Sequence, residues 1–214
     1  MSEEPSRLSE EEHAQIAQAI RDAETRTSGE IFAVVARASD DYFYVAAMLS
    51  GFWSIAIGAA LALAAWALGE PLSSLALMAV VVLSLLIFLG FFHFFPEQRL
   101  AFIPRSVGYR RASSNAVRQF LAHGIHETND RSGVLLFVSL AERYAEVVAD
   151  AGINAKVDQS EWNAMVASLI THSAKDQVAQ GFLEAIDQAG ALLAQHFPPV
   201  EGEKNELDDK LIEL

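Results

Sequence analysis

The sequence has no cysteine among its 214 residues. Disulfide bonds, thiolate metal sites and cysteine nucleophiles are therefore excluded, although the absence of cysteine alone does not fix the redox compartment. Basic residues are also few, since 15 Lys and Arg stand against 28 Asp and Glu and give a formal net charge of −13. Because binding to nucleic-acid phosphates needs clustered Lys and Arg, no nucleic-acid partner is expected.

Several catalytic and targeting signatures are missing as well. No Gly-rich loop followed by Lys and Ser or Thr is present to cradle a phosphate, and no Gly-x-Ser-x-Gly elbow presents a serine nucleophile. Residues 1–30 are acidic and amphipathic, and they lack the basic start and apolar run of a secretory signal. The sequence thus contains no complete catalytic set and predicts no export signal.

Charge is almost absent from residues 42–95, where Glu70 is the only Asp, Glu, Lys or Arg. Residues 43–68 and 72–95 are two uncharged runs, and each is long enough as a helix to cross a hydrocarbon core of about 30 Å. The sequence Gly-Glu-Pro at residues 69–71 breaks the helix between them. The pattern predicts a transmembrane helical hairpin, so the lipid bilayer is an expected partner.

Small residues four apart on the first span would let the second helix approach closely: Ser54, Gly58 and Ala62, and also Ala47 with Gly51. Tight packing within the hairpin is favoured over a seam between two copies of the chain. Transport is a third alternative, but a transporter usually needs an ionisable group inside the membrane, and only His93, near one end of a span, qualifies.

The arginines near the ends of the spans predict the orientation in the membrane. Arg37 precedes the first span and the connector has no Lys or Arg, whereas four arginines follow the second span: Arg99, Arg105, Arg110 and Arg111. Positive residues stay in the cytoplasm, so both soluble parts should be cytoplasmic, on the inner face of a bacterial-type plasma membrane. The segment from Arg99 to Arg118 also contains apolar side chains and could lie on the anionic leaflet as a membrane-surface anchor.

The segments on either side of the hairpin alternate between helix and strand patterns. Predicted helices begin near Ser9 (with a capping box to Glu12), Ala112, Asp158 and Asp176, and predicted strands cover residues 30–36, 133–139 and 143–149. A lone strand at 30–36 would leave its backbone groups unpaired, so it must pair with strands beyond the hairpin. Residues 1–41 and 96–199 should therefore form one α/β domain with a mixed sheet, followed by a mobile acidic tail at 200–214.

This arrangement resembles the TPM domain family, which is named after a thylakoid acid phosphatase, a photosystem II repair protein and a modulator of nematode acetylcholine receptors. The matching segments are residues 27–31 (Thr-Ser-Gly-Glu-Ile), 131–139 (Arg-Ser-Gly-Val-Leu-Leu-Phe-Val-Ser) and 146–153 (Glu-Val-Val-Ala-Asp-Ala-Gly-Ile). The resemblance implies an α/β/α sandwich and, in some relatives, a divalent metal near acidic loops. Many relatives are exported and carry a membrane helix after the domain, whereas here a hairpin interrupts it.

Three carboxylates near predicted strand ends are candidate metal ligands. Glu30 opens the first strand, Asp130 precedes the second, and Asp150 follows the third. If the strand directions bring them together, they could hold Ca²⁺ or Mg²⁺, which prefer oxygen ligands. The alternative is turn formation and helix capping. Arg131 could pair with one of these acids or hold a phosphate.

A zinc site is less favoured. His123 and His126 are three residues apart, but Gly124 between them weakens the helix that would place both on one face.

Two functions from different classes remain. The first is a membrane-anchored interaction or assembly module that acts on other membrane proteins through its sheet edge or acidic surface. The second is a divalent-metal-dependent phosphomonoesterase that uses Asp150, Asp130 and Glu30 as metal ligands. The sequence alone does not decide whether the chain is an enzyme.

Overall fold

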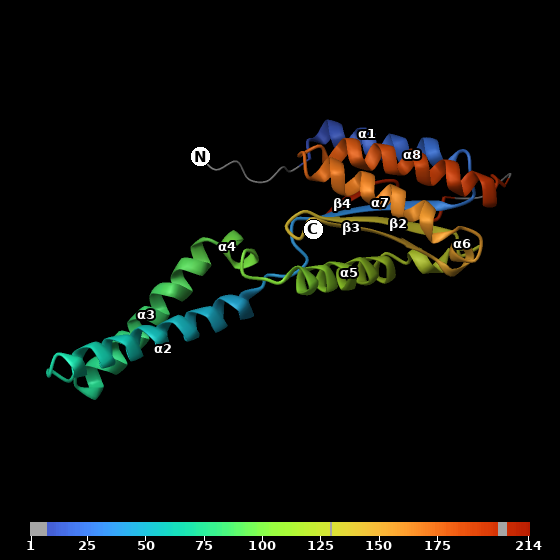
Figure 1. Cartoon of the computed structure of the whole chain (residues 1–214). Helices are drawn as coiled ribbons and strands as arrows, with labels where there is room; N and C mark the ends of the chain where they lie inside the picture. Colours follow the sequence, from blue (N-terminus) through green and yellow to red (C-terminus); the bar gives the residue numbers. More distant parts are fainter. Residues whose placement is uncertain (1–7, 129, 201–204) are drawn as a thin grey trace. The chain divides into compact units, whose positions relative to one another are not determined.

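The computed structural model describes residues 8–128, 130–200 and 205–214 (Figure 1). The chain divides into two compact units. Residues up to Ser39 and from Ser106 to Leu214 form the first unit, and Asp40–Arg105 forms the second. The first unit is an α/β domain, and the second is a helical hairpin.

A four-stranded mixed sheet forms the centre of the α/β domain, with the order β3-β2-β1-β4. β1 (Glu30–Ala36) lies parallel to β2 (Gly133–Ser139) and to β4 (Leu211–Glu213), and β2 lies antiparallel to β3 (Tyr144–Ala149). All residues of β1 and β2 are buried, as expected for continuous apolar strands that are covered on both faces. The predicted bounds of these two strands and the predicted mixed sheet are confirmed.

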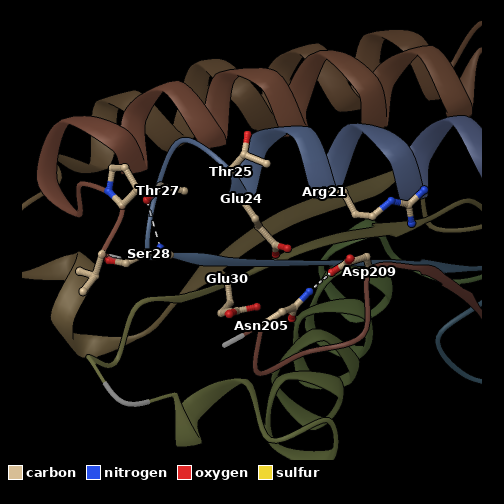
Figure 2. A pocket seen from close by; sticks show the side chains of 11 residues that line it. Arg21, Glu24, Thr25, Thr27, Ser28, Glu30, Asn205 and Asp209 are labelled. Carbon is tan, nitrogen blue, oxygen red and sulfur yellow. Dashed lines mark hydrogen bonds between the residues drawn. The ribbon is translucent and has the colours of Figure 1, made fainter. Parts of the chain in front are cut away.

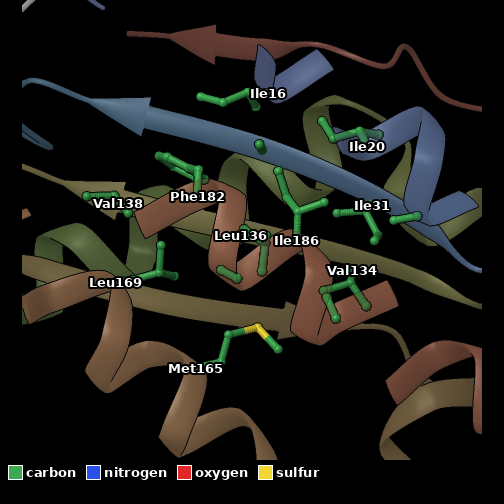
Figure 3. Packing of buried hydrophobic residues seen from close by; sticks show 14 of the residues in the cluster. Ile16, Ile20, Ile31, Val134, Leu136, Val138, Met165, Leu169, Phe182 and Ile186 are labelled. Carbon is green, nitrogen blue, oxygen red and sulfur yellow. The ribbon is translucent and has the colours of Figure 1, made fainter. Parts of the chain in front are cut away.

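Three helices cover one face of this sheet: α1 (Glu10–Glu24), α7 (Gln159–Ser173) and α8 (Val178–His196) (Figure 1). The apolar stripes of these helices pack on the odd-numbered residues of β1 and the even-numbered residues of β2, and Figure 3 shows members of this core, including Ile16, Ile31, Leu136, Leu169 and Phe182. The predicted capping box begins α1: Ser9 Oγ accepts the Glu12 amide, and Glu12 Oε2 accepts the Ser9 amide.

A single long helix, α5 (Arg105–Ala122), covers the other face (Figure 1). Ala112, Ala116 and Phe120 of α5 pack against β1 and β2 in a second, smaller core. The remaining short elements of the domain are a 3₁₀ turn, η1 (Ile125–Glu127), and a four-residue helix, α6 (Ala151–Asn154). The domain is thus a sheet with helices on both sides, which is the predicted α/β/α sandwich.

The parallel pairing of β1 with β2 explains why the hairpin can interrupt the domain. Parallel neighbours need a crossover connection, and α5 provides it across one face of the sheet. The hairpin unit is inserted into this crossover, between the end of β1 and the start of α5. β1 is still paired with a strand more than 90 positions later in the sequence, Ala36 lying opposite Ser139.

The second unit consists of two long apolar helices, α2 (Phe43–Ala67) and α3 (Ser74–Phe94), and the short helix α4 (Glu97–Leu100). By length and composition, α2 and α3 could each cross a membrane. They differ from core helices of a soluble protein, because only 22% and 6% of their most apolar windows are buried. Most of their apolar side chains therefore have no protein cover among the described residues.

The two long helices pack through small side chains. The buried residues of α2 nearest this contact recur every four positions: Ala46, Ser50, Ser54 and Gly58. A Cβ atom at Gly58 would lie 2.6 Å from Cγ2 of Val81 in α3, so only glycine permits this approach. The predicted close approach of the second helix is therefore present at Gly58, whereas a Cβ atom at Gly51 would have nothing within 4 Å.

Other expectations need correction. The C-terminal acidic segment was expected to be mobile, but β4 adds a strand to the sheet: Leu214 donates its amide to Val35 O, and Arg37 donates its amide to Leu214 O. Residues 201–204 of the predicted tail lie outside the described residues. The helix expected from Ala112 begins at Arg105, and the one expected from Asp176 begins at Val178.

Candidate functional site

One end of the sheet collects the residues singled out from the sequence. In the strand register, Glu30 lies opposite Gly133, and Asp150 donates its amide to Gly133 O. The start of β1, the start of β2 and the end of β3 therefore meet at the same end of the sheet. Glu30 and Asp150 are nevertheless separated by β2, which places their backbones about 10 Å apart at the usual strand spacing.

Glu30 lines a cavity of about 430 Å³ at this end, together with side chains from α1 and from the segment before β4 (Figure 2). The side chain is only 8% exposed. Its Oε1 accepts the Glu206 amide at 3.1 Å, but its Oε2 is buried with no hydrogen-bond partner. Burial raises the pKa of the Glu30 carboxyl group above its usual value, and the nearby Glu206 and Asp209 carboxylates raise it further.

Two further acids share this cavity with Glu30. Glu24 comes from the last turn of α1, and one of its carboxyl oxygens accepts the Ile31 amide at 2.9 Å. Asp209 comes from the segment before β4 and accepts a hydrogen bond from the Asn205 side chain at 2.5 Å (Figure 2). We call Glu24, Glu30 and Asp209, with Asn205, the acidic pocket.

The electrostatics of the acidic pocket favour a bound proton. Burial, with smaller contributions from Glu30 and Asp209, raises the pKa of Glu24 to about 9. Glu24 is therefore protonated at neutral pH, because its partly buried charge would otherwise face other acids.

Asp150 and Arg131 form a separate contact. Asp150 caps α6, its Oδ1 accepting the Ala151 amide at 2.6 Å, and Nη1 of Arg131 lies 3.5 Å from the same oxygen. Oδ2 of Asp150 is buried without a hydrogen-bond partner. Asp150 therefore caps a helix, which was the alternative to a metal ligand, and Arg131 forms an ion pair with it.

Asp130 does not join Glu30 and Asp150. Its side chain is exposed in the turn before β2, where its main chain approaches Gly152 closely. Within the part of the chain that the structure describes, no group of three or more His, Asp or Glu side chains is placed to hold a metal. The predicted histidine pair is also divided, since the His123 ring packs on Phe32 and the His126 ring on Phe120.

The sequence did not indicate three members of the acidic pocket, Glu24, Asn205 and Asp209. Glu24 was part of an ordinary helix end, and Asp209 fell in the segment expected to be mobile. The only local signal was the apolar pair Leu211-Ile212, which marks a short strand after the acidic residues.

The predicted membrane-surface arginines fall into two groups. Arg99 is buried in the hairpin unit, where its guanidinium group donates to the carbonyl oxygens of Asp41 and Phe92. Its charge is thus used inside the unit, contrary to the prediction that it faces lipid. Arg105, Arg110 and Arg111 are exposed on α5, which contains no Asp or Glu.

Comparison with known proteins bears on the family and the fold. The family model of the TPM domain matches residues 98–192. The NMR structure of the BA42 protein from the psychrophilic bacterium Bizionia argentinensis is similar, with a TM-score of 0.61, 20% sequence identity and coverage of 100% of each chain. No curated protein matches the chain. The resemblance to the TPM domain family is thereby confirmed over residues 98–192, and the two long apolar helices α2 and α3 precede the matched residues.

Proposed function

We propose that this chain is a membrane-anchored TPM domain that serves as an interaction or assembly module for other membrane proteins. The observation that carries the proposal is the pair of apolar helices, largely without protein cover, inserted in the crossover of the domain. An insertion at this point would attach the domain to the bilayer at two places in the chain, one before and one after the hairpin. The proposed partners would contact the sheet edges or the acidic surface of the domain.

The distribution of arginine supports a cytoplasmic domain at the inner membrane. Arg105, Arg110 and Arg111 follow α3 closely, whereas residues 68–73 between the two helices contain no Lys or Arg. Both soluble parts lie on the same side if both helices cross. The exposed arginines of α5 would lie against anionic lipid, at about 1 kcal/mol for each basic residue near the surface.

Cysteine labelling tests the topology, because the chain has no cysteine of its own. Ser173→Cys, at the end of α7, should react with an impermeant maleimide only from the cytoplasmic side. Glu70→Cys, in the exposed connector, should react only from the opposite side. If both positions react from the same side, the proposed pair of spans is wrong.

The alternative, a divalent-metal-dependent phosphomonoesterase, has less support. Glu30 and Asp150 each keep one buried carboxyl oxygen without a partner, which is the observation in its favour. However, β2 separates Glu30 on β1 from Asp150 at the end of β3, and Asp150 is already engaged by Arg131 and the start of α6.

Turnover of a generic phosphate ester, with and without Mg²⁺ or Ca²⁺, separates these two functions. The interaction module predicts no metal-dependent turnover by the purified chain. Turnover that requires the metal and is lost in both Glu30→Gln and Asp150→Ala would instead favour the esterase.

A further inference from the structure

The two faces of the sheet are covered by helices of opposite charge. α1, α7 and α8, which cover one face, contain eight Asp and Glu residues and a single Arg. α5, which covers the other face, contains four Arg and no Asp, Glu or Lys (Figure 1). α5 is thus a basic element on a chain whose formal net charge is −13.

The exposed side of α5 carries apolar side chains among its arginines. Arg110, Ser114, Val117 and Leu121 follow one another at intervals of three or four residues, so they form one stripe along the helix, with Arg118 beside it. All five are exposed, Val117 by 45% and Leu121 by 53%. The opposite side of α5 packs on β1 and β2. At 1.5 Å per residue, the stripe is about 17 Å long.

This combination of side chains is typical of a helix that lies at a membrane surface. Arginine is attracted to anionic phospholipid headgroups, and apolar side chains leave water when they enter the boundary between headgroups and acyl chains. A single exposed apolar residue is common on any protein surface and needs no explanation. Val117 and Leu121, however, lie on successive turns of one stripe that contains no acid to repel a headgroup.

The connections to the hairpin keep the domain near the bilayer if α2 and α3 cross it. Six residues, 37–42, join β1 to α2, and ten residues, 95–104, join α3 to α5. Six residues extend by about 20 Å at most, at 3.3–3.6 Å per residue. Docking of α5 on the lipid would then be an intramolecular step, which is favoured by the high effective concentration of the tethered partner.

We infer that the exposed stripe of α5 docks on anionic phospholipid, with Arg110 and Arg118 at the headgroups and Val117 and Leu121 below them. This inference rests on the proposed function, and it identifies the surface of the domain that faces the bilayer. An acidic segment of a protein is the alternative occupant of a basic surface. Lipid is favoured because a bilayer offers negative charge and an apolar layer together, along the whole length of the stripe.

A fluorescent label within the stripe tests the inference on the full-length chain in lipid nanodiscs. Since the chain has no cysteine, Ser114→Cys can carry a single nitrobenzoxadiazole label, and Ala164→Cys, exposed on α7, is the matched position on the other side of the sheet. In equal parts of phosphatidylglycerol and phosphatidylcholine, the emission of the label at residue 114 should shift to shorter wavelength. Neither phosphatidylcholine alone nor the label at residue 164 should show this shift.

Salt provides a further test of the charge contribution. Raising NaCl from about 0.1 M to about 1 M shortens the Debye length from about 10 Å to about 3 Å. Because Arg110 and Arg118 are exposed, their attraction to the headgroups should be screened, and the shift at residue 114 should be reversed.

Variants of exposed side chains then assign the contacts without disturbing the fold. Arg110→Gln and Arg118→Gln should each lower the ratio of docked to undocked chain about fivefold. Arg21→Gln, which changes an exposed arginine of α1, is the matched control and should have no effect. Leu121→Ser should also weaken docking, whereas Ile170→Ser, at a side chain of α7 that is 38% exposed, should not.

Three results would overturn the inference: the same emission at residue 114 in both lipid compositions, a shift that Arg110→Gln and Arg118→Gln together leave unchanged, or a shift caused by a capped polyglutamate peptide but not by anionic lipid. The last would show that an acidic protein segment occupies the stripe. Co-elution of the chain with the nanodisc reports the membrane anchor separately. A chain that co-elutes without a shift contradicts the docking alone, whereas a chain that elutes free of the nanodisc contradicts the anchor and the docking with it.

Discussion

Arg99 Nη1 donates a hydrogen bond of 2.9 Å to the main-chain carbonyl oxygen of Asp41, 58 positions earlier in the chain. Its Nε and Nη2 atoms donate to Phe92 O at 3.1 and 2.8 Å. Asp41 precedes α2 and Phe92 lies in the last turn of α3, so one guanidinium group ties together the two ends of the hairpin. A charged guanidinium group forms strong hydrogen bonds with carbonyl oxygens, and these bonds satisfy main-chain acceptors at the two ends of the apolar hairpin.

Replacing Arg99 by Ala should loosen both ends of the hairpin. The variant leaves the carbonyl groups of Asp41 and Phe92 without this donor, at a cost of about 1–3 kcal/mol. In detergent, amide hydrogen exchange at Val45 and Phe95 should accelerate by about tenfold or more. Arg105→Ala, which removes an exposed arginine, is the matched control and should leave both rates unchanged. Unchanged exchange in Arg99→Ala would mean that the hydrogen bonds contribute no local stability.

Gly152 permits a close approach between α6 and the turn before β2. A Cβ atom there would lie 2.5 Å from Asp130 O and 2.7 Å from Arg131 O, both backbone atoms that cannot rotate away. Gly152→Ala should therefore lower the free energy of unfolding by about 1–3 kcal/mol and disturb the Arg131–Asp150 pair. Thermal or urea unfolding measures the change. Gly51→Ala, where nothing lies within 4 Å, is the control, and an equal loss there would contradict the steric explanation.

Leu211 holds the last strand of the sheet. It is 5% exposed and belongs to the core beneath α1 and α8, although it lies in the segment expected from the sequence to be mobile. Leu211→Ala should cost about 2–5 kcal/mol, as is typical for a buried leucine. Leu214→Ala, where the side chain is 45% exposed, should cost less than about 0.5 kcal/mol. Equal unfolding midpoints for the two variants would instead support the expectation that the C-terminal segment is mobile.

The sequence was most informative where apolar residues run without interruption. β1 and β2 begin and end at the predicted residues, because a strand buried on both faces has no polar position to blur its limits. β4 escaped prediction, since a three-residue strand has too few positions to show a period, and its partners in β1 are distant in sequence. For the same reason the acidic pocket could not be predicted: Glu24 and Asp209 meet only after β4 has joined the sheet.

Arg99 illustrates a second limit of sequence reasoning. The position of an arginine beside a span predicts the side of the membrane, which is a statement about the whole segment. It does not predict which individual side chain folds back onto carbonyl groups. The neighbouring Arg105 carries the same charge, yet it is exposed at the start of α5.

The acidic pocket makes stability depend on pH. Glu24 has a pKa near 4.5 when the chain is unfolded and about 9 in the folded domain, so between these values the folded state binds a proton that the unfolded state has released. The free energy of unfolding should therefore fall as pH rises from 4.5 to 9, by at most about 1.4 kcal/mol per pH unit from this group. Below pH 4.5 both states hold the proton and the contribution is constant.

Glu24→Gln should remove this dependence, because the amide keeps an oxygen for the Ile31 N–H without a charge to bury. Its unfolding midpoint should exceed that of the unsubstituted chain at pH 8 and approach it at pH 5. Glu11→Gln, an exposed change on the same helix, should alter neither the midpoint nor its slope with pH. A midpoint difference between Glu24→Gln and the unsubstituted chain that is the same at pH 5 and pH 8 would show that Glu24 does not titrate in this range. The pH dependence would then come from Glu30, whose pKa is also raised by burial, and Glu30→Gln rather than Glu24→Gln would remove it.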